Sequence, residues 1–302
     1  MKVAVTGGAG FIGSHLVDKL IEEKNTVTVI DNLCAGKQEH VDTKATFIKK
    51  DIRQNLSNEF KDIEAVFHFA ADPEVRSSAT APTNGFDINV VGTMSVLEAC
   101  RTSKVKHIIL ASTSTVYGYS ETIPTPEDNM CSPISNYGAS KLACEAYFSS
   151  YSSSYGIKST CLRFANIFGE RSTHGVMFDF YNKLKKNPNE LEILGDGKQD
   201  KSYLHVSDCV SAILTAFKKQ KKTSDVYNVG SQEKTTVNHL AKLVCNNLGI
   251  DPLFKYTGSK QGWVGDVPLM LLDVSKLEKL GWKQKLNFAD GVKQYVNWLR
   301  NH

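Results

Sequence analysis

The chain has 302 residues, of which 41% are hydrophobic and 23% charged, with 21 Gly and 8 Pro. This composition is ordinary for a globular protein and excludes a disordered, collagen-like or coiled-coil chain. A net charge of +4, spread over 36 basic and 32 acidic residues, gives no reason to expect nucleic acid or an anionic membrane as a partner. The longest apolar runs are strand-sized, far short of the roughly 18 to 20 residues of a membrane span, so we expect a soluble protein.

The N-terminus and the cysteines both favour a cytoplasmic location. Met1 to Val3 lead straight into a buried-looking strand, which leaves no room for an export signal. The seven cysteines are odd in number and widely scattered, so neither disulfides nor a metal site is indicated. We expect reduced thiols in the core of a cytoplasmic protein.

The first half of the chain alternates short β-branched runs with longer helical patterns, which is typical of βαβ units. The short runs predict strands at Val3–Thr6, Val27–Ile30, Thr46–Lys49, Ala65–His68, His107–Ala111 and Ser159–Arg163. The helical patterns between them predict helices at Phe11–Glu22, Asn84–Arg101 and Asn136–Tyr155. Because such crossovers are right-handed, we predict an α/β fold with a doubly wound parallel sheet, the Rossmann arrangement.

After about residue 166 the pattern loosens into short strands, glycine turns and helices, which predicts a smaller α/β lobe. The helices expected there are Val206–Lys219, Val237–Leu248 and Phe288–Leu299. We therefore predict a dinucleotide-binding domain over residues 1–165, joined by segments that return to it from about residues 200–230. Residues 166–302 then form the C-terminal substrate domain.

A glycine-rich turn follows the first strand. Gly7, Gly10 and Gly13 stand at three-residue spacing around the start of the first helix, which includes Phe11 and Ile12. Such glycines allow a tight turn and a close approach of the backbone to a pyrophosphate, while the helix N-terminus supplies amide donors and partial positive charge. The order of strand, turn and helix predicts that these five residues bind a dinucleotide.

The second strand ends at Asp31, which is followed by Asn32. A carboxylate at this position accepts hydrogen bonds from both hydroxyls of an adenosine ribose and repels a 2′-phosphate, so NAD is favoured over NADP. The alternative is that Asp31 merely caps the next turn. The preceding glycine-rich turn makes the cofactor role the better interpretation.

Two further strand ends offer contacts to the same cofactor. Asp51 and Ile52 follow the third strand and are candidates to hold the adenine, although an Asp after a strand is equally often a turn former. The fourth strand is followed by Phe69 and two small residues, Ala70 and Ala71, which let a cofactor lie close to the backbone. The alternative for this segment is ordinary close packing.

Tyr137 and Lys141 stand four residues apart in a predicted helix, so they share one face. A nearby ammonium favours the phenolate, so we expect the pKa of Tyr137 to fall from about 10 toward neutrality, which suits a general base or acid. The pair gains weight from Ser112, Thr113 and Ser114 at the end of the fifth strand, beside the expected crevice. One of these hydroxyls is expected to orient a substrate oxygen toward Tyr137, the alternative being local backbone bonding.

Together these motifs resemble those of the extended short-chain dehydrogenase/reductase superfamily, and within it the nucleotide-sugar epimerases of the UDP-glucose 4-epimerase type. The resemblance spans nearly the whole chain and is less specific about the sugar. It is carried by TGGAGFIGSH at Thr6–His15, DNLC at Asp31–Cys34, HFAA at His68–Ala71, NVVGT at Asn89–Thr93, STSTVYG at Ser112–Gly118, YGASK at Tyr137–Lys141, LRFANIFG at Leu162–Gly169, GDGKQDKSYLHVSDC at Gly195–Cys209 and WVGDVP at Trp263–Pro268.

The resemblance implies roles at the catalytic and cofactor end. Thr113 matches the Ser/Thr position, Tyr137 the base, and Lys141 the lysine that also binds the nicotinamide ribose. Asn89 matches a structural polar residue near the active site, and Phe164 matches the residue that flanks the nicotinamide pocket.

The resemblance also implies a UDP-sugar site in the C-terminal domain. Asn166, Lys201 and Asp266 match positions that contact the nucleotide diphosphate or its uridine ribose. Lys201 stands where Arg is usual, which keeps the charge and loses the bidentate fork, and Gln261 replaces a second Arg of close relatives. Met270 matches the position whose bulk is associated with acceptance of an N-acetyl group at C2.

The expected reaction is NAD-dependent inversion of C4 of a UDP-hexose, UDP-glucose or UDP-galactose, through a transient 4-keto sugar. Sister dehydratases carry an Asp-Glu pair, and related UDP-glucuronate decarboxylases a Glu, where this chain has Ser114 and Thr115. The alternatives are an epimerase of UDP-glucuronate or of a UDP-N-acetylhexosamine, and a 4-reductase, although such reductases commonly use NADP. A catalytically inactive NAD(H)-sensing protein is the alternative of another class, although such proteins generally lose the Tyr or the Lys.

The family also implies a homodimer in which Asn84–Arg101 and Asn136–Tyr155 form a four-helix bundle with the partner.

Overall fold

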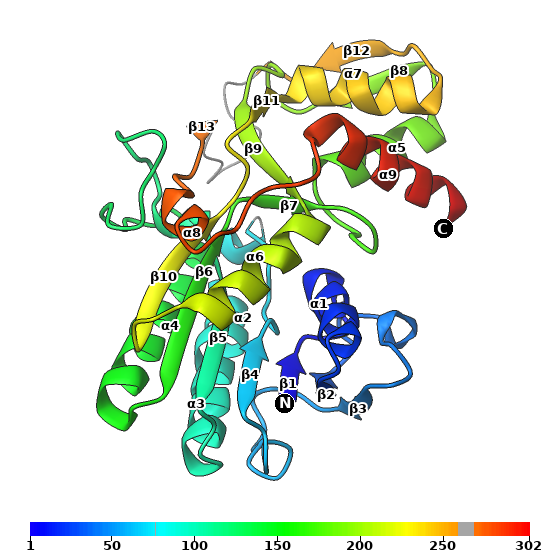
Figure 1. Ribbon diagram of the computed structural model, residues 1–302. Helices are drawn as coiled ribbons and strands as arrows, with labels where there is room; N and C mark the ends of the chain where they lie inside the picture. Colours follow the sequence, from blue (N-terminus) through cyan, green and yellow to red (C-terminus); the bar gives the residue numbers. More distant parts are fainter. Residues whose placement is uncertain (76, 259–268) are drawn as a thin grey trace.

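A computed structural model describes residues 1–75, 77–258 and 269–302. It shows a larger α/β unit with a smaller lobe at the carboxyl ends of its strands (Figure 1). The large sheet has the strand order β10-β6-β5-β4-β1-β2-β3, and every neighbouring pair runs parallel. Its members are β1 (Lys2–Thr6), β2 (Thr26–Asp31), β3 (Thr46–Lys49), β4 (Ala65–His68), β5 (His107–Thr113), β6 (Lys158–Phe164) and β10 (Ser224–Val229). The predicted doubly wound parallel sheet is confirmed.

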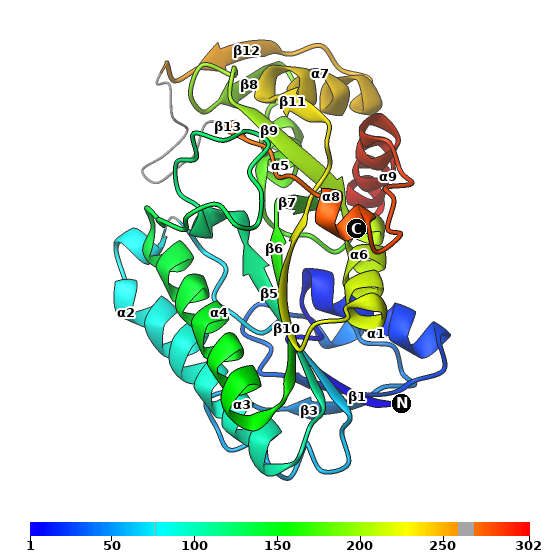
Figure 2. The same ribbon diagram turned by 60° about the vertical axis from the view of Figure 1, so that its left-hand side comes forward.

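Helices cover both faces of this sheet (Figure 2). One face carries α3 (Gly92–Thr102) and α4 (Asn136–Tyr155), and the other carries α1 (Phe11–Glu22) and α6 (Val206–Lys219). Successive residues of β5 enter two separate cores, because side chains alternate between the faces of a strand. Burial on both faces explains why the central strands β1, β4 and β5 read as nearly continuous apolar runs.

The predicted helix Asn84–Arg101 is helical throughout, but it is not one regular α-helix. A short α2 (Pro82–Gly85) leads into η3, a π-helical stretch at Phe86–Val91, before α3 begins. The wider π turns contain Asn89. Because π turns arise from local tertiary contacts at functional sites, the hydrophobic period of the sequence does not reveal them.

The smaller lobe contains two further sheets and a third core. Strand β9 pairs with β7, β11 and β13, while β8 pairs in parallel with β12. Its elements are β7 (Asn166–Phe168), α5 (Val176–Lys186), β8 (Glu190–Ile193), β9 (Asp200–His205), β11 (Lys234–Thr236), α7 (Val237–Leu248), β12 (Leu253–Tyr256), β13 (Leu269–Met270) and α9 (Phe288–Asn301). Helix α8 (Ser275–Glu278) instead packs against β10 and α6, with Leu277 in the first core. Side chains of α5, α7 and α9 form the third core.

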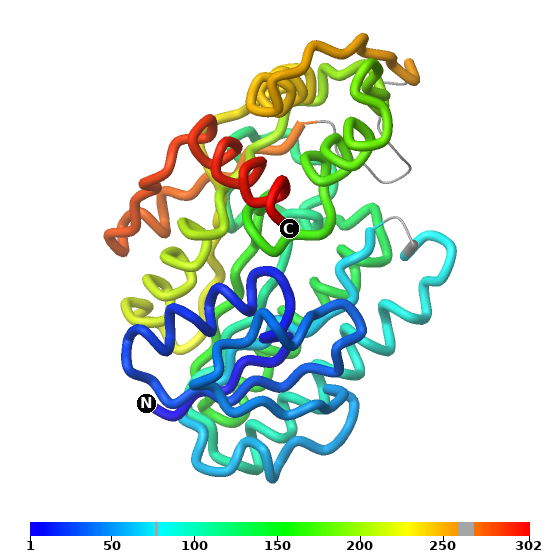
Figure 3. The backbone as a smooth tube through the Cα atoms, turned by 90° about the vertical axis from the view of Figure 1, so that its right-hand side faces the viewer, coloured from blue at the N-terminus to red at the C-terminus, as the bar shows by residue number. Residues whose placement is uncertain are grey.

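The chain returns from this lobe to the large sheet through α6 and β10. Figure 3 shows the yellow α6 beside the blue α1, and the two helices share one hydrophobic core. We therefore propose to keep the division at residue 165, with this returning segment assigned to the first domain.

All seven cysteines are free thiols, of which five are buried. The expectation of core cysteines is wrong for Cys34, which is exposed in the turn after β2, and Cys131 is only half-buried. Within the described residues, no helix combines the length and apolar character that a membrane crossing needs.

Candidate active site

The predicted cofactor and catalytic residues converge on the carboxyl edge of the large sheet. Gly7 follows β1, Asp31 ends β2, Phe69 follows β4, Thr113 ends β5 and Phe164 ends β6 (Figure 1). The strand order reverses between β1 and β4, and open α/β sheets bind their ligands outside the strand ends at such a point.

The glycine-rich turn is packed too closely for side chains. Gly7 has a left-handed φ of 72°, and a Cβ on it would lie 2.5 Å from the backbone nitrogen of Ala70. A Cβ on Gly13 would lie 2.1 Å from the carbonyl oxygen of Gly7. The turn therefore presents bare backbone, which is the surface that a pyrophosphate requires.

Helix α1 begins beside this turn without a polar cap. Its N-cap residue is Gly10, no side chain caps it, and its first turn holds no acidic residue. The amide groups of that turn, which includes Phe11 and Ile12, are therefore available to an anion. The bare backbone and the uncapped helix start fit the pyrophosphate of NAD.

Asp31 ties the turn to the loop after β2. Its carboxylate accepts hydrogen bonds from the amides of Ala9 at 3.0 Å and Leu33 at 2.8 Å, and the residue is 7% exposed. Asp31 therefore caps the local backbone, as the alternative interpretation expected. An ionised carboxylate accepts about four hydrogen bonds, so two positions remain for ribose hydroxyls.

Asn32 and Asp51 form a polar rim after β2 and β3. Asn32 donates to Asp51 at 3.1 Å, and Arg53 donates to both oxygens of the same carboxylate at 2.9 and 2.8 Å. The Arg53 hydrogen bonds hold the pKa of Asp51 well below its usual range. Ile52 is buried against Gly92. The turn-forming alternative accounts for these contacts, and contact with adenine stays a prediction.

The three predicted catalytic residues lie together. Ser135 caps α4 by accepting a hydrogen bond from the Gly138 amide at 3.1 Å, which fixes the first turn of the helix. The Tyr137 hydroxyl in that turn is hydrogen-bonded to Thr113 at the end of β5. Lys141 follows one helical turn later and is 3% exposed. This arrangement can hold and move a proton at the Tyr137 oxygen.

The prediction that the pKa of Tyr137 falls is wrong for the protein without bound cofactor or substrate. Burial raises the pKa of Tyr137 to about 12, and the hydrogen bond with Thr113 opposes this only in part. Burial also lowers the pKa of the Lys141 ammonium. Desolvation is the largest cause of both shifts, because burial removes water from the charged form of each group.

The hydroxyls at the end of β5 take different roles. The strand runs two residues beyond its predicted end, so Thr113 reaches Tyr137, whereas Ser112 points to α4 and donates to Glu145 at 2.5 Å. Thr113 also accepts the amide of Thr115 at 3.2 Å, which caps η4 (Ser114–Val116). The Thr113 hydroxyl therefore both bonds the local backbone and contacts Tyr137, so the two alternative interpretations hold together.

Asn89 connects the loop after β4 to helix α4. Its side chain accepts the Asp72 amide at 2.8 Å and donates to the Asp72 carbonyl at 3.1 Å and to Ser140 at 2.9 Å. These contacts support a structural role. Phe164 ends β6 as a buried ring, with its centroid 6.1 Å from that of Phe69.

The predicted substrate residues that are described belong to one small sheet. Lys201 of β9 pairs with Met270 of β13, and β9 also pairs with β7, which carries Asn166. Asn166 is exposed and Met270 is 6% exposed. Asp266 and Gln261 lie outside the described residues.

The sequence analysis missed a buried ion pair behind the catalytic residues. Glu145 and Arg163 approach to 2.7 Å, with 6% of each side chain exposed. The available signal was Arg163 between Leu162 and Phe164 in a predicted strand, because a buried charge requires a partner. In the part of the chain that the structure describes, no group of three His, Cys, Asp or Glu side chains is placed to hold a metal ion.

The fold and the site define an NAD-binding enzyme of the extended short-chain dehydrogenase/reductase type. The chain belongs to the NAD-dependent epimerase/dehydratase family, whose model matches residues 3–230. The chain is thus an enzyme of the epimerase type, an isomerase, and its cofactor is NAD.

Full-length relatives agree with this assignment. A putative UDP-glucose 4-epimerase of Methanocaldococcus jannaschii is 38% identical over 99% of each chain. A crystal structure of a UDP-galactose 4-epimerase is 43% identical, with a TM-score of 0.92 over 100% of this chain and 99% of that one. A UDP-N-acetylglucosamine 4-epimerase from Methanobrevibacter ruminantium is 32% identical, with a TM-score of 0.92 over 99% and 98% of the two chains.

The position of Asp31 leads to a prediction about cofactor choice. NAD is expected to bind at least about tenfold more tightly than NADP, because a buried carboxylate repels a 2′-phosphate. Calorimetric titration of the cofactor-free protein with each dinucleotide measures the difference. Equal or tighter binding of NADP contradicts the assignment of Asp31 to the ribose.

Proposed function

We propose that the protein interconverts UDP-glucose and UDP-galactose by inverting C4 of the hexose through a transient 4-keto sugar. The observation that carries this proposal is the hydrogen bond between Tyr137 and Thr113, beside the buried Lys141 and the NAD-binding turn. Full-length similarity to proteins named UDP-glucose and UDP-galactose 4-epimerases supports it.

In the proposed reaction Tyr137 takes the proton of the C4 hydroxyl and later returns it. Bound NAD supplies the hydride acceptor and donor, and its oxidised ring adds a positive charge that favours the Tyr137 phenolate. Thr113 orients the C4 oxygen, and Lys141 holds the nicotinamide ribose and stabilises the phenolate. Asn166 and Lys201, with Asp266, hold the UDP portion, so the sugar ring is free to turn and present its other face.

The test is incubation of the purified protein with UDP-glucose, UDP-N-acetylglucosamine and UDP-glucuronate, with chromatographic separation of the C4 epimers. We expect UDP-galactose from UDP-glucose and no loss of mass. Ser114 and Thr115 offer no carboxyl group to protonate a leaving hydroxyl or to assist decarboxylation. Loss of water or carbon dioxide, detected by mass spectrometry, contradicts epimerisation.

Met270 is proposed to set the choice between plain and N-acetylated hexoses. It is buried beside Lys201 in the small sheet, and Met is flexible enough to fill the pocket or to move aside. We expect preference for UDP-glucose and weaker activity on UDP-N-acetylglucosamine, the substrate named for one structural relative. Met270→Tyr should abolish the N-acetyl activity and spare the plain hexose, because added bulk penalises the larger substituent. An unchanged ratio of the two kcat/KM values excludes Met270 as the gate.

We also propose a cytoplasmic homodimer formed through α3 and α4. The η3 stretch that leads into α3 and helix α4 expose large apolar side chains, with Phe86 56%, Val91 41% and Tyr147 41% exposed. Two such helix pairs form a four-helix bundle across a two-fold axis. Light scattering on a sizing column is expected to give twice the mass of the chain, and a monomer at micromolar concentration contradicts the proposal.

A further inference from the structure

A buried polar network lies behind the catalytic residues, where β5, β6, β10 and α4 meet. Its centre is Arg163 on β6, which is 5% exposed. Arg163 pairs with Ser112 in the β5–β6 ladder, and Ser112 immediately precedes Thr113. The two side chains leave the sheet on the face that α4 covers, since both contact Glu145 there.

Glu145 joins this pair from the helix. It follows Lys141 by four residues and Tyr137 by eight, so the three share one face of α4. Its carboxylate accepts Arg163 Nε at 3.0 Å and Nη2 at 2.7 Å, together with the Ser112 hydroxyl at 2.5 Å. A guanidinium fork fixes geometry as well as charge, so α4 cannot slide along β5 without breaking these bonds.

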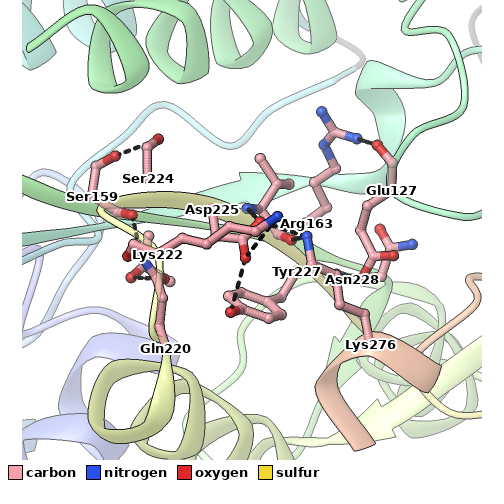
Figure 4. Close-up of polar contacts among 12 residues, drawn as sticks. Glu127, Ser159, Arg163, Gln220, Lys222, Ser224, Asp225, Tyr227, Asn228 and Lys276 are labelled. Atoms are coloured by element: carbon pink, nitrogen blue, oxygen red, sulfur yellow. Dashed lines mark hydrogen bonds and ion pairs between the residues drawn. The ribbon is translucent and has the colours of Figure 1, made fainter. Parts of the chain in front are cut away.

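Arg163 also reaches the opposite side of the network. Its Nη1 donates to the Tyr117 hydroxyl at 2.9 Å and to the Glu127 carbonyl at 3.0 Å. Figure 4 shows the guanidinium directed at Glu127 in the loop that follows β5. Tyr117 in turn donates to Asn228 of β10 at 2.7 Å.

Asn228 extends the network to the segment that follows Met270. Its side-chain amide donates to the carbonyls of Thr125 at 2.9 Å and Asp273 at 3.0 Å. Thr125 also donates its amide to the Leu271 carbonyl at 2.8 Å. One continuous set of hydrogen bonds thus joins the catalytic helix to the proposed substrate segment.

We propose that Arg163 is a positioning residue for the reaction. Through Glu145 it fixes the face of α4 that bears Tyr137 and Lys141 against the Thr113 end of β5. Through Tyr117 and Asn228 it fixes the segment after Met270 relative to that unit. The inference rests on the proposed function only in assigning the chemistry to Thr113, Tyr137 and Lys141.

The charge of Glu145 gives the network a second measurable effect. Burial lowers the pKa of Lys141, and Cys144, Glu145 and Cys161 each oppose this lowering. The charge of Lys141 in turn lowers the pKa of His68 on β4, after burial as the main cause. Glu145→Gln therefore makes the Lys141 ammonium deprotonate at lower pH, so the alkaline limb of the kcat–pH profile is expected to move to lower pH.

The main test is Arg163→Lys, which keeps the positive charge and loses the fork. We expect kcat to fall about tenfold or more with little change in KM, because small misplacements of catalytic groups cost such factors. Asn228→Ala is expected to raise KM instead, because it releases the segment after Met270.

The control is Asp208→Asn. Asp208 is 2% exposed, and its carboxylate accepts hydrogen bonds from the amides of Lys285 and Leu286. These residues are far along the chain from the catalytic helix.

The control separates positioning from a loss of stability. If Arg163→Lys and Asp208→Asn lower Tm equally, only the first should lower kcat. An unchanged kcat in Arg163→Lys, or an equal loss of kcat in both variants, overturns the proposal. A wild-type protein that epimerises no UDP-sugar refutes the proposed function instead. Hydrogen exchange over residues 136–145, which needs no substrate, then still tests the positioning role: exchange must be faster in Arg163→Lys than in the control.

Discussion

Replacing Tyr137 by Phe is expected to lower turnover at least about a hundredfold while NAD stays bound. The hydroxyl is the group placed to exchange a proton with the C4 oxygen, and its loss leaves the glycine-rich turn intact. Steady-state kinetics with UDP-galactose and calorimetry with NAD measure the two effects. Tyr155→Phe is the matched control, because Tyr155 ends the same helix and is 54% exposed. Near-normal turnover of Tyr137→Phe removes Tyr137 from the mechanism.

Gly7→Ala is expected to raise the dissociation constant for NAD at least about a hundredfold. The new Cβ would meet the Ala70 nitrogen at 2.5 Å, so the turn and the strand end after β4 must move apart. Calorimetric titration with NAD measures the loss, and thermal unfolding shows whether the variant folds.

Gly156→Ala is the control for backbone strain. Gly156 has a φ of 71°, nearly that of Gly7, but a Cβ on it meets nothing within 4 Å. It should lower the free energy of unfolding by about 1–2 kcal/mol and leave NAD affinity unchanged. If Gly7→Ala and Gly156→Ala bind NAD with equal affinity, the close packing at Gly7 is not what NAD binding requires.

Much of the large sheet could be predicted because its central strands are buried on both faces and read as apolar runs. The seventh strand is different: β10 reads SDVYNV, and its polar residues are satisfied by partners far away in the sequence. Asn228 of this strand is fully buried and bonds Tyr117, Thr125 and Asp273. A local pattern cannot show that a buried Asn has such partners.

The candidate site also has one part that the local sequence predicts and another part that it does not. The spacing of Tyr137 and Lys141 on one helix, and the position of Thr113 at a strand end, follow from local periodicity and sheet topology. The pKa of Tyr137 cannot be predicted in this way, because it depends on how completely the tertiary structure removes water from the hydroxyl. The Glu145–Arg163 pair joins residues on a helix and on the following strand, so the sequence shows two charges without their contact.

The return of the chain through α6 and β10 also governs how the protein folds during synthesis. Until residue 229 has left the ribosome, β6 is the outer strand of the sheet, and the backbone groups on the edge that β10 later pairs have no partner strand. A fragment that ends at residue 165 keeps every residue of the NAD-binding turn and still lacks both the strand that closes this edge and the helix that packs on α1. Such a fragment exposes a long strand edge beside an uncovered apolar face, which favours association between chains over a stable monomer. The solubility of the cofactor-binding domain thus depends on α6 and β10, which are translated after the first part of the substrate lobe.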